Sequence, residues 1–115
     1  MTARPLLVLT TLPDPSIAES IGRRLIDDGC AACVSVGAPM LSLYHWRGKT
    51  ETATEIQLVI KTTTLRYDAV EALLRNLHPY ELPEIIAIPI AAGFAPYLDW
   101  ISAESDRSKD FPIVC

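Results

Sequence analysis

The chain has 115 residues, half of them hydrophobic and 21% charged, which is typical of one folded domain and excludes a disordered segment. Its formal net charge of −4 argues against nucleic acid or an anionic membrane as a partner, because both bind basic surfaces. The longest apolar stretches, such as residues 85–92, are too short to cross a bilayer, and the apolar run at 6–9 is too short for a signal peptide. We therefore expect a single cytoplasmic domain over residues 1–115.

The first third of the chain predicts a strand, a helix and a second strand. Residues 6–12 are apolar and threonine-rich, as in a buried strand. Asp14 or Ser16 can cap a helix with an apolar stripe at helical spacing, and Gly29 is a typical helix stop. Residues 31–37 are β-prone and predict the next strand.

Cys30 and Cys33 have the C-x-x-C spacing of redox and zinc-binding cysteines. Redox pairs begin a helix, whereas this pair follows a helix stop and enters a strand, and no second Cys or His pair follows at zinc spacing. Side chains three residues apart in a strand face opposite sides. We therefore expect reduced thiols that do not bond to each other, and we assign Cys115 to a tail.

The middle of the chain predicts a long β-hairpin. Two β-prone segments, 41–46 and 55–63, flank a turn at 47–49. Each strand can exceed the usual length of about five or six residues, so the hairpin should project beyond the core of a small domain. Exposed strand edges need a cover, and a second subunit is the usual one. We therefore expect a subunit interface at Tyr44 and Trp46.

The last third predicts a helix over residues 65–77, an edge strand over 84–90 that contains Pro89, a short helix around 94–101 and a polar tail over 103–115. The complete order is β-α-β-β-α-β with one added C-terminal helix. This order is typical of the ferredoxin-like split βαβ arrangement, an α+β fold.

Residues 78–84, His-Pro-Tyr-Glu-Leu-Pro-Glu, are the segment richest in ionisable groups between prolines. Imidazole, thiolate and carboxylate are good ligands for copper and zinc, so His78, Cys33 and Glu84 are candidate metal ligands. The alternative is a stiff helix-to-strand turn in which His78 is a hydrogen-bonded structural residue. The sequence has no phosphate-binding glycine motif and no H-E-x-x-H pattern, so we do not expect an enzyme.

Four short motifs, in order along the chain, resemble the CutA family. They are Ala31-Ala32-Cys33-Val34, Ser42-Leu43-Tyr44-x-Trp46-x-Gly48-Lys49, Glu55 with Lys61-Thr62, and His78-Pro79-Tyr80-Glu81-x-Pro83-Glu84, and Tyr97-Leu98-x-Trp100 fits as well. The resemblance covers residues 6–102, nearly the whole chain.

The resemblance implies a ferredoxin-like homotrimer similar to PII signalling proteins, with a role in divalent-cation tolerance and copper binding. It also implies a cleft between subunits, around Cys33, Trp46, Lys61, His78, Tyr80 and Glu84. The chain departs from some members at Thr10, where they carry a cysteine, and at Leu77, where they carry a second histidine.

Two functions from different classes follow from these observations. The first is a cytoplasmic trimer that binds a divalent ion such as Cu or Zn weakly, because Thr10 and Leu77 remove two metal ligands. The alternative is a PII-like sensor or scaffold that holds a small anionic ligand between subunits, with Lys61 beside Tyr80 and Trp46.

Overall fold

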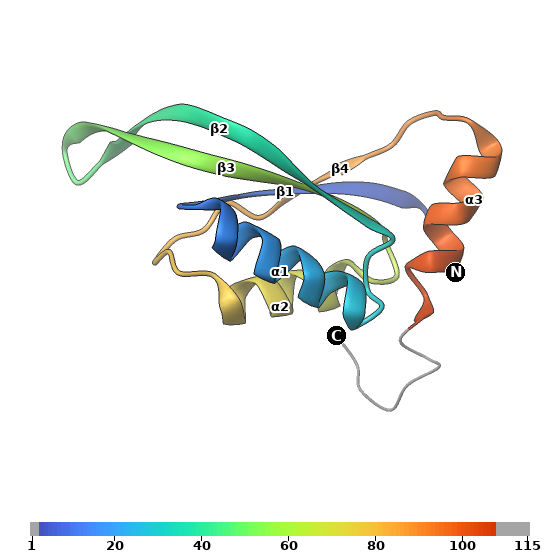
Figure 1. The fold of residues 1–115 in the computed structure, drawn as a ribbon. Helices are drawn as coiled ribbons and strands as arrows, with labels where there is room; N and C mark the ends of the chain where they lie inside the picture. Colours follow the sequence, from blue (N-terminus) through green and yellow to red (C-terminus); the bar gives the residue numbers. More distant parts are fainter. Residues whose placement is uncertain (1–2, 108–115) are drawn as a thin grey trace.

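The computed structural model describes residues 3–107. Within this range the chain forms four strands and three helices, in the order β1 (Pro5–Leu12), α1 (Pro15–Asp27), β2 (Cys33–Trp46), β3 (Lys49–Thr63), α2 (Tyr67–Leu77), β4 (Ile86–Pro89) and α3 (Ala95–Glu104). The strands form one antiparallel sheet in the order β2-β3-β1-β4. Helices α1 and α2 cover one face of the sheet, and α3 lies beside the end where β1 begins (Figure 1). The predicted ferredoxin-like α+β fold is confirmed.

Helix α1 begins after Asp14, the first of the two predicted caps, and ends before the predicted stop at Gly29. The Asp14 carboxylate accepts a hydrogen bond of 2.9 Å from the Ile17 N–H, and Pro15 occupies the first helical position, where no N–H is needed. Gly29 follows the helix with a φ of 78°, a conformation that glycine adopts without a steric cost. These two signals set the length of α1 before any tertiary contact is considered.

Strand β2 is longer than predicted, because the segments expected at 31–37 and 41–46 are parts of one strand. The pairing with β3 shifts register between Val36 and Pro39, which is a β-bulge. A Cβ on Gly37 in this bulge would lie 3.2 Å from the Gln57 carbonyl oxygen, so the backbone approach favours glycine here. The predicted strand ended at Gly37, whereas the bulge allows β2 to continue through Gly37 and Pro39.

The β2–β3 hairpin projects past the other strands of the sheet, as predicted (Figure 1). Its turn is formed by Arg47 and Gly48, with φ values of 50° and 81°. Two consecutive positive φ values define the tight turn whose twist matches that of the flanking strands.

The hydrophobic core lies between the sheet and the two covering helices. Alternate residues of β1, such as Leu6 and Val8, face this core and are buried. The intervening residues face the other side of the sheet, where paired strands bring together a set that we term the open apolar face: Leu7, Leu9, Val59, Ile86 and Ile88. Ile86 and Ile88 remain 48% and 43% exposed, so this face is only partly covered within one chain.

The C-terminal third differs from the prediction in three places. Helix α2 begins at Tyr67, because residues 64–66 form a turn, and the edge strand is confirmed but shortened to β4. The predicted tail is partly structured, since residues 103–104 belong to α3 and Ser105 is buried. The remainder of the tail from residue 108, with Cys115, lies outside the described residues. Among residues 3–107, no helix is long and apolar enough to cross a membrane.

Candidate functional site

His78 is held at the junction between α2 and the loop that leads to β4. Its backbone N–H donates to the Leu74 carbonyl at 2.8 Å and completes the last turn of α2. Its own backbone is extended, with φ −72° and ψ 133°, because Pro79 disfavours a helical residue before it. The predicted end of the helix at Leu77 is therefore confirmed, and the His78 side chain points toward the end of β1.

Both ring nitrogens of His78 are engaged in hydrogen bonds. Nε2 lies 2.9 Å from the Thr11 carbonyl oxygen and 3.1 Å from the Thr10 hydroxyl, and Nδ1 lies 3.2 Å from the Tyr80 backbone nitrogen. A carbonyl can only accept and a backbone N–H can only donate, so Nε2 carries the proton and Nδ1 accepts. Burial lowers the pKa of His78, although the Thr11 carbonyl and the charge of Glu55 oppose the shift. The imidazole is therefore neutral at pH 7.

Tyr80 connects this loop to the long hairpin. Its hydroxyl donates to the Glu55 carboxylate at 2.9 Å, and its ring packs against the His78 ring with centroids 4.9 Å apart. Burial would raise the pKa of Glu55, but hydrogen bonds from Ser42, Tyr80 and Thr11 together hold it below its ordinary value. Burial and the Glu55 carboxylate both raise the pKa of Tyr80 well above its ordinary range. Glu55 is therefore ionised and Tyr80 neutral across the physiological range.

The hairpin turn also contacts this loop. Arg47 forms a 3.2 Å ion pair with Glu81, in which both side chains are exposed, so it contributes little stability. The Arg47 guanidinium lies 5.4 Å from the ring centroid of Trp46. Trp46 is half-buried and Tyr44 is 44% exposed, and both lie on the projecting part of β2.

A second polar cluster lies at the opposite end of the sheet. The Lys61 ammonium donates to the Tyr97 hydroxyl at 3.0 Å and lies 5.3 Å from the centroid of the same ring. Tyr97 stacks on Trp100 with centroids 5.5 Å apart, and Cys33 pairs with Lys61 across β2 and β3. The hydrogen bond with Tyr97 raises the pKa of Lys61, and burial offsets part of this effect.

The two clusters do not meet within one chain. Lys61 pairs with Leu7, whereas His78 contacts Thr11, which lies four positions farther along β1, roughly 13 Å at the usual rise of a strand. Lys61 therefore lies beside Tyr97 in the same chain and not beside Tyr80. Trp46 is farther still, because it pairs with Lys49 at the far end of β3.

The three candidate metal ligands are likewise dispersed. His78 contacts the C-terminal end of β1, Cys33 begins β2 at the opposite end of the sheet, and the Glu84 side chain is exposed on the loop. Within residues 3–107, no group of three or more His, Cys, Asp or Glu side chains is placed to hold a metal ion. One chain alone therefore does not fit a metal, and coordination by His78 would require one of its ring nitrogens to lose a present partner.

Cys30 and Cys33 are thiols that are not bonded to each other, as predicted, but the reason differs. Cys30 precedes the strand and is fully buried in the core, where its thiol lies 3.5 Å from the Leu25 carbonyl and its own carbonyl accepts from the Thr62 hydroxyl at 2.7 Å. Cys33 is half-buried at the start of β2.

Sequence reasoning missed several partners of the candidate residues. Glu55 and Tyr97 were noted only as parts of motifs, yet they accept the hydrogen bonds of Tyr80 and Lys61. Thr10, where the resemblance implies a cysteine in some CutA members, lies against the His78 ring. The alternation of β3 placed Glu55 and Lys61 on one face, which was a usable signal, but only the antiparallel register identifies their neighbours.

Comparison with known proteins gives a consistent result. The family model described as CutA1 divalent ion tolerance protein matches residues 6–104. The chain is 39% identical over 95 residues to the divalent-cation tolerance protein CutA of Thermus thermophilus, covering 83% of this chain and 92% of the relative. It is 42% identical over 91 residues to the CutA homolog of Xenopus laevis, covering 79% of this chain and 60% of that longer protein.

Solved structures show the same similarity. CutA from Xylella fastidiosa superposes with a TM-score of 0.87 at 44% identity, covering 90% of this chain and 99% of that one. A CutA from Archaeoglobus fulgidus, described as a periplasmic divalent cation tolerance protein, superposes with a TM-score of 0.85 at 35% identity, covering 89% of this chain and 99% of that one.

Proposed function

The chain belongs to the CutA1 divalent ion tolerance protein family, and from this premise we propose that it acts in copper tolerance as a homotrimer that binds a divalent ion such as Cu or Zn weakly. The proposed activity is binding and not catalysis. The observation that carries the proposal is the match of residues 6–104 to a family described by divalent ion tolerance. Because Cys33, His78 and Glu84 do not converge within one chain, we propose that a metal site built from them lies between subunits.

The trimer is supported by the surfaces that one chain leaves uncovered. The open apolar face contains aliphatic side chains from β1, β3 and β4. On the opposite face of the projecting hairpin, Leu41 and Leu43 are 65% and 66% exposed. Exposed aliphatic side chains on unpaired strands favour association, and closed symmetric assembly covers them without leaving a free edge. We place Tyr44 and Trp46 in this interface.

Weak binding is supported by the state of the His78 ring. A metal can be bound only at a nitrogen lone pair, and the lone pair of Nδ1 accepts the Tyr80 N–H. Coordination therefore exchanges an existing hydrogen bond for the metal bond, which lowers the net affinity.

Calorimetric titration with Cu(II) and Zn(II) tests this proposal. We expect His78→Ala to lower copper affinity by at least about tenfold, because each lost ligand removes a bond that the remaining ones do not replace. His45→Ala is the matched control, since His45 is an exposed histidine on the hairpin. Equal copper affinities for the wild type and His78→Ala would remove His78 from the ligand set.

The second candidate function is a sensor or scaffold that binds a small anionic ligand, as PII-like proteins do. It is favoured by Lys61, a half-buried residue whose pKa is raised by the hydrogen bond with Tyr97, so the charge persists at physiological pH. A lysine point charge is a common anion-binding group in proteins. Titration with pyrophosphate and citrate, with Lys61→Met as the control, separates this function from metal binding.

We also propose that the protein resides in the cytoplasm, where the thiols of Cys30 and Cys33 would stay reduced. The Archaeoglobus fulgidus relative is described as periplasmic. Cell fractionation with an antibody against this chain decides between the two compartments.

A further inference from the structure

Helix α3 has little apolar packing of its own. Ile101 is its one fully buried residue among those described, whereas Tyr97 and Trp100 are 40% and 43% exposed, and Phe94 at the start of the helix is 76% exposed. The N-terminus of α3 lacks a side-chain cap. A helix with one buried anchor is marginal by itself, so other contacts must hold it against the sheet.

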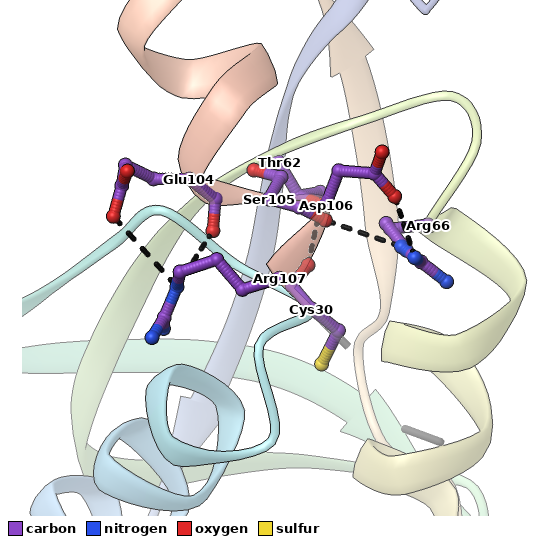
Figure 2. Close-up of polar contacts among 7 residues, drawn as sticks. All are labelled: Cys30, Thr62, Arg66, Glu104, Ser105, Asp106 and Arg107. Carbon is purple, nitrogen blue, oxygen red and sulfur yellow. Dashed lines mark hydrogen bonds and ion pairs between the residues drawn. The ribbon is translucent and has the colours of Figure 1, made fainter. Parts of the chain in front are cut away.

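Residues 105–107, which we term the strap, supply those contacts. Arg66, the residue before α2, donates from Nε to the Ser105 carbonyl at 3.2 Å and pairs through Nη2 with the Asp106 carboxylate at 2.6 Å (Figure 2). Arg107 donates to the Ile26 carbonyl at the end of α1. The Arg66 side chain is only 18% exposed, so its ion pair is less screened than one on the surface. The strap thus ties the end of α3 to both covering helices.

Near the N-terminus of α3, Tyr97 contacts the Lys61 ammonium. The hydroxyl oxygen accepts a hydrogen bond from the ammonium, and the face of the ring adds a cation–π contact. A phosphate or carboxylate oxygen that accepted a hydrogen bond from this N–H would take the position of the Tyr97 oxygen. The Tyr97 hydroxyl therefore occupies one of the three N–H donors of the Lys61 ammonium.

We propose that α3 is a lid over Lys61, held closed by the strap, and that Tyr97 stands in for an oxygen of an anionic ligand. The inference rests on the second candidate function, because it concerns the same lysine. It adds a mechanism of access: a ligand that uses this donor of Lys61 displaces the Tyr97 hydroxyl or binds when the strap releases. The ligand class is a small molecule with phosphate or carboxylate oxygens.

Access to Lys61 can be measured without any ligand. Brief acetylation of the purified protein, followed by peptide mass spectrometry, gives the labelling rate of Lys61 relative to Lys49, which is exposed at the hairpin turn. We expect the ratio to rise about fivefold in Tyr97→Phe, the factor that corresponds to about 1 kcal/mol for one lost hydrogen bond. Asp106→Ala should raise it similarly by releasing the strap. Asp99→Ala, which removes an exposed carboxylate of the same helix, should not.

A ratio that stays at the wild-type value in Tyr97→Phe or Asp106→Ala overturns the lid. Pyrophosphate titration gives an independent result. Tighter binding by Tyr97→Phe than by the wild type supports the lid, and weaker binding overturns it, because Tyr97 would then belong to the ligand site. Absence of pyrophosphate binding in every variant rejects the anionic-ligand function, while the labelling ratio still decides whether α3 covers Lys61.

Discussion

Replacing His78 by alanine should destabilise the fold, because the imidazole joins the end of α2 to the end of β1. The substitution removes the hydrogen bond to the Thr11 carbonyl and the one from the Tyr80 N–H. Each is worth about 1 kcal/mol, so the expected loss in the free energy of unfolding is about 2 kcal/mol. For a domain of this size that loss lowers Tm by roughly 8 °C.

The same substitution should change how stability depends on pH. Burial lowers the pKa of His78 below its ordinary value of 6.5, so the unfolded chain binds the proton more readily than the folded protein. The stability that neutral His78 contributes is therefore complete above pH 6.5 and is lost as the pH falls below that value toward the folded pKa. The difference between the wild type and His78→Ala should shrink over this interval.

Urea unfolding followed by circular dichroism, at fixed protein concentration and at several pH values between 5 and 8 in about half-unit steps, measures both effects. His45→Ala is the control, because it removes an exposed histidine of the hairpin. Equal unfolding midpoints for His78→Ala and His45→Ala at pH 7 would contradict a structural role of the imidazole. A difference between wild type and His78→Ala that grows on acidification would contradict the lowered pKa.

Three further predictions concern other parts of the molecule. Glu55→Gln should lower stability by about 1 kcal/mol at pH 7, because the Tyr80 hydroxyl then donates to a neutral acceptor. The loss should shrink as the pH falls and acid protonates the wild-type carboxylate, whose pKa lies below its ordinary value, and thermal unfolding at pH 7 and 3 can check this. Mass spectrometry of the air-oxidised native protein should find no bond between Cys30 and Cys33, since the Cys30 side chain is fully buried; a bridged peptide would contradict this. Light scattering at micromolar concentration should give three times the chain mass, and a monomer would refute the proposed trimer.

The sequence by itself determined the elements whose signals are local. A carboxylate cap at Asp14, a glycine stop at Gly29 and a proline after His78 each act through the backbone of their own few residues. Such signals can be read from the sequence because they act without any contact to a distant residue. The order of strands and helices then restricts the topology to few alternatives, which is why the ferredoxin-like arrangement was predictable.

Tertiary structure alone decided which side chains meet. Tyr80 donates a hydrogen bond to Glu55, and Lys61 donates one to Tyr97, although the partners are 25 and 36 residues apart in the sequence. These pairings depend on strand register, on a bulge that lets β2 continue past Pro39, and on a strap that sets where α3 lies. The register, the bulge and the position of the strap each depend on contacts between residues far apart in the sequence, so no local pattern predicts them. The sequence therefore identified the candidate polar and ionisable residues, and the register of β1 and β3 showed that they form two separate clusters.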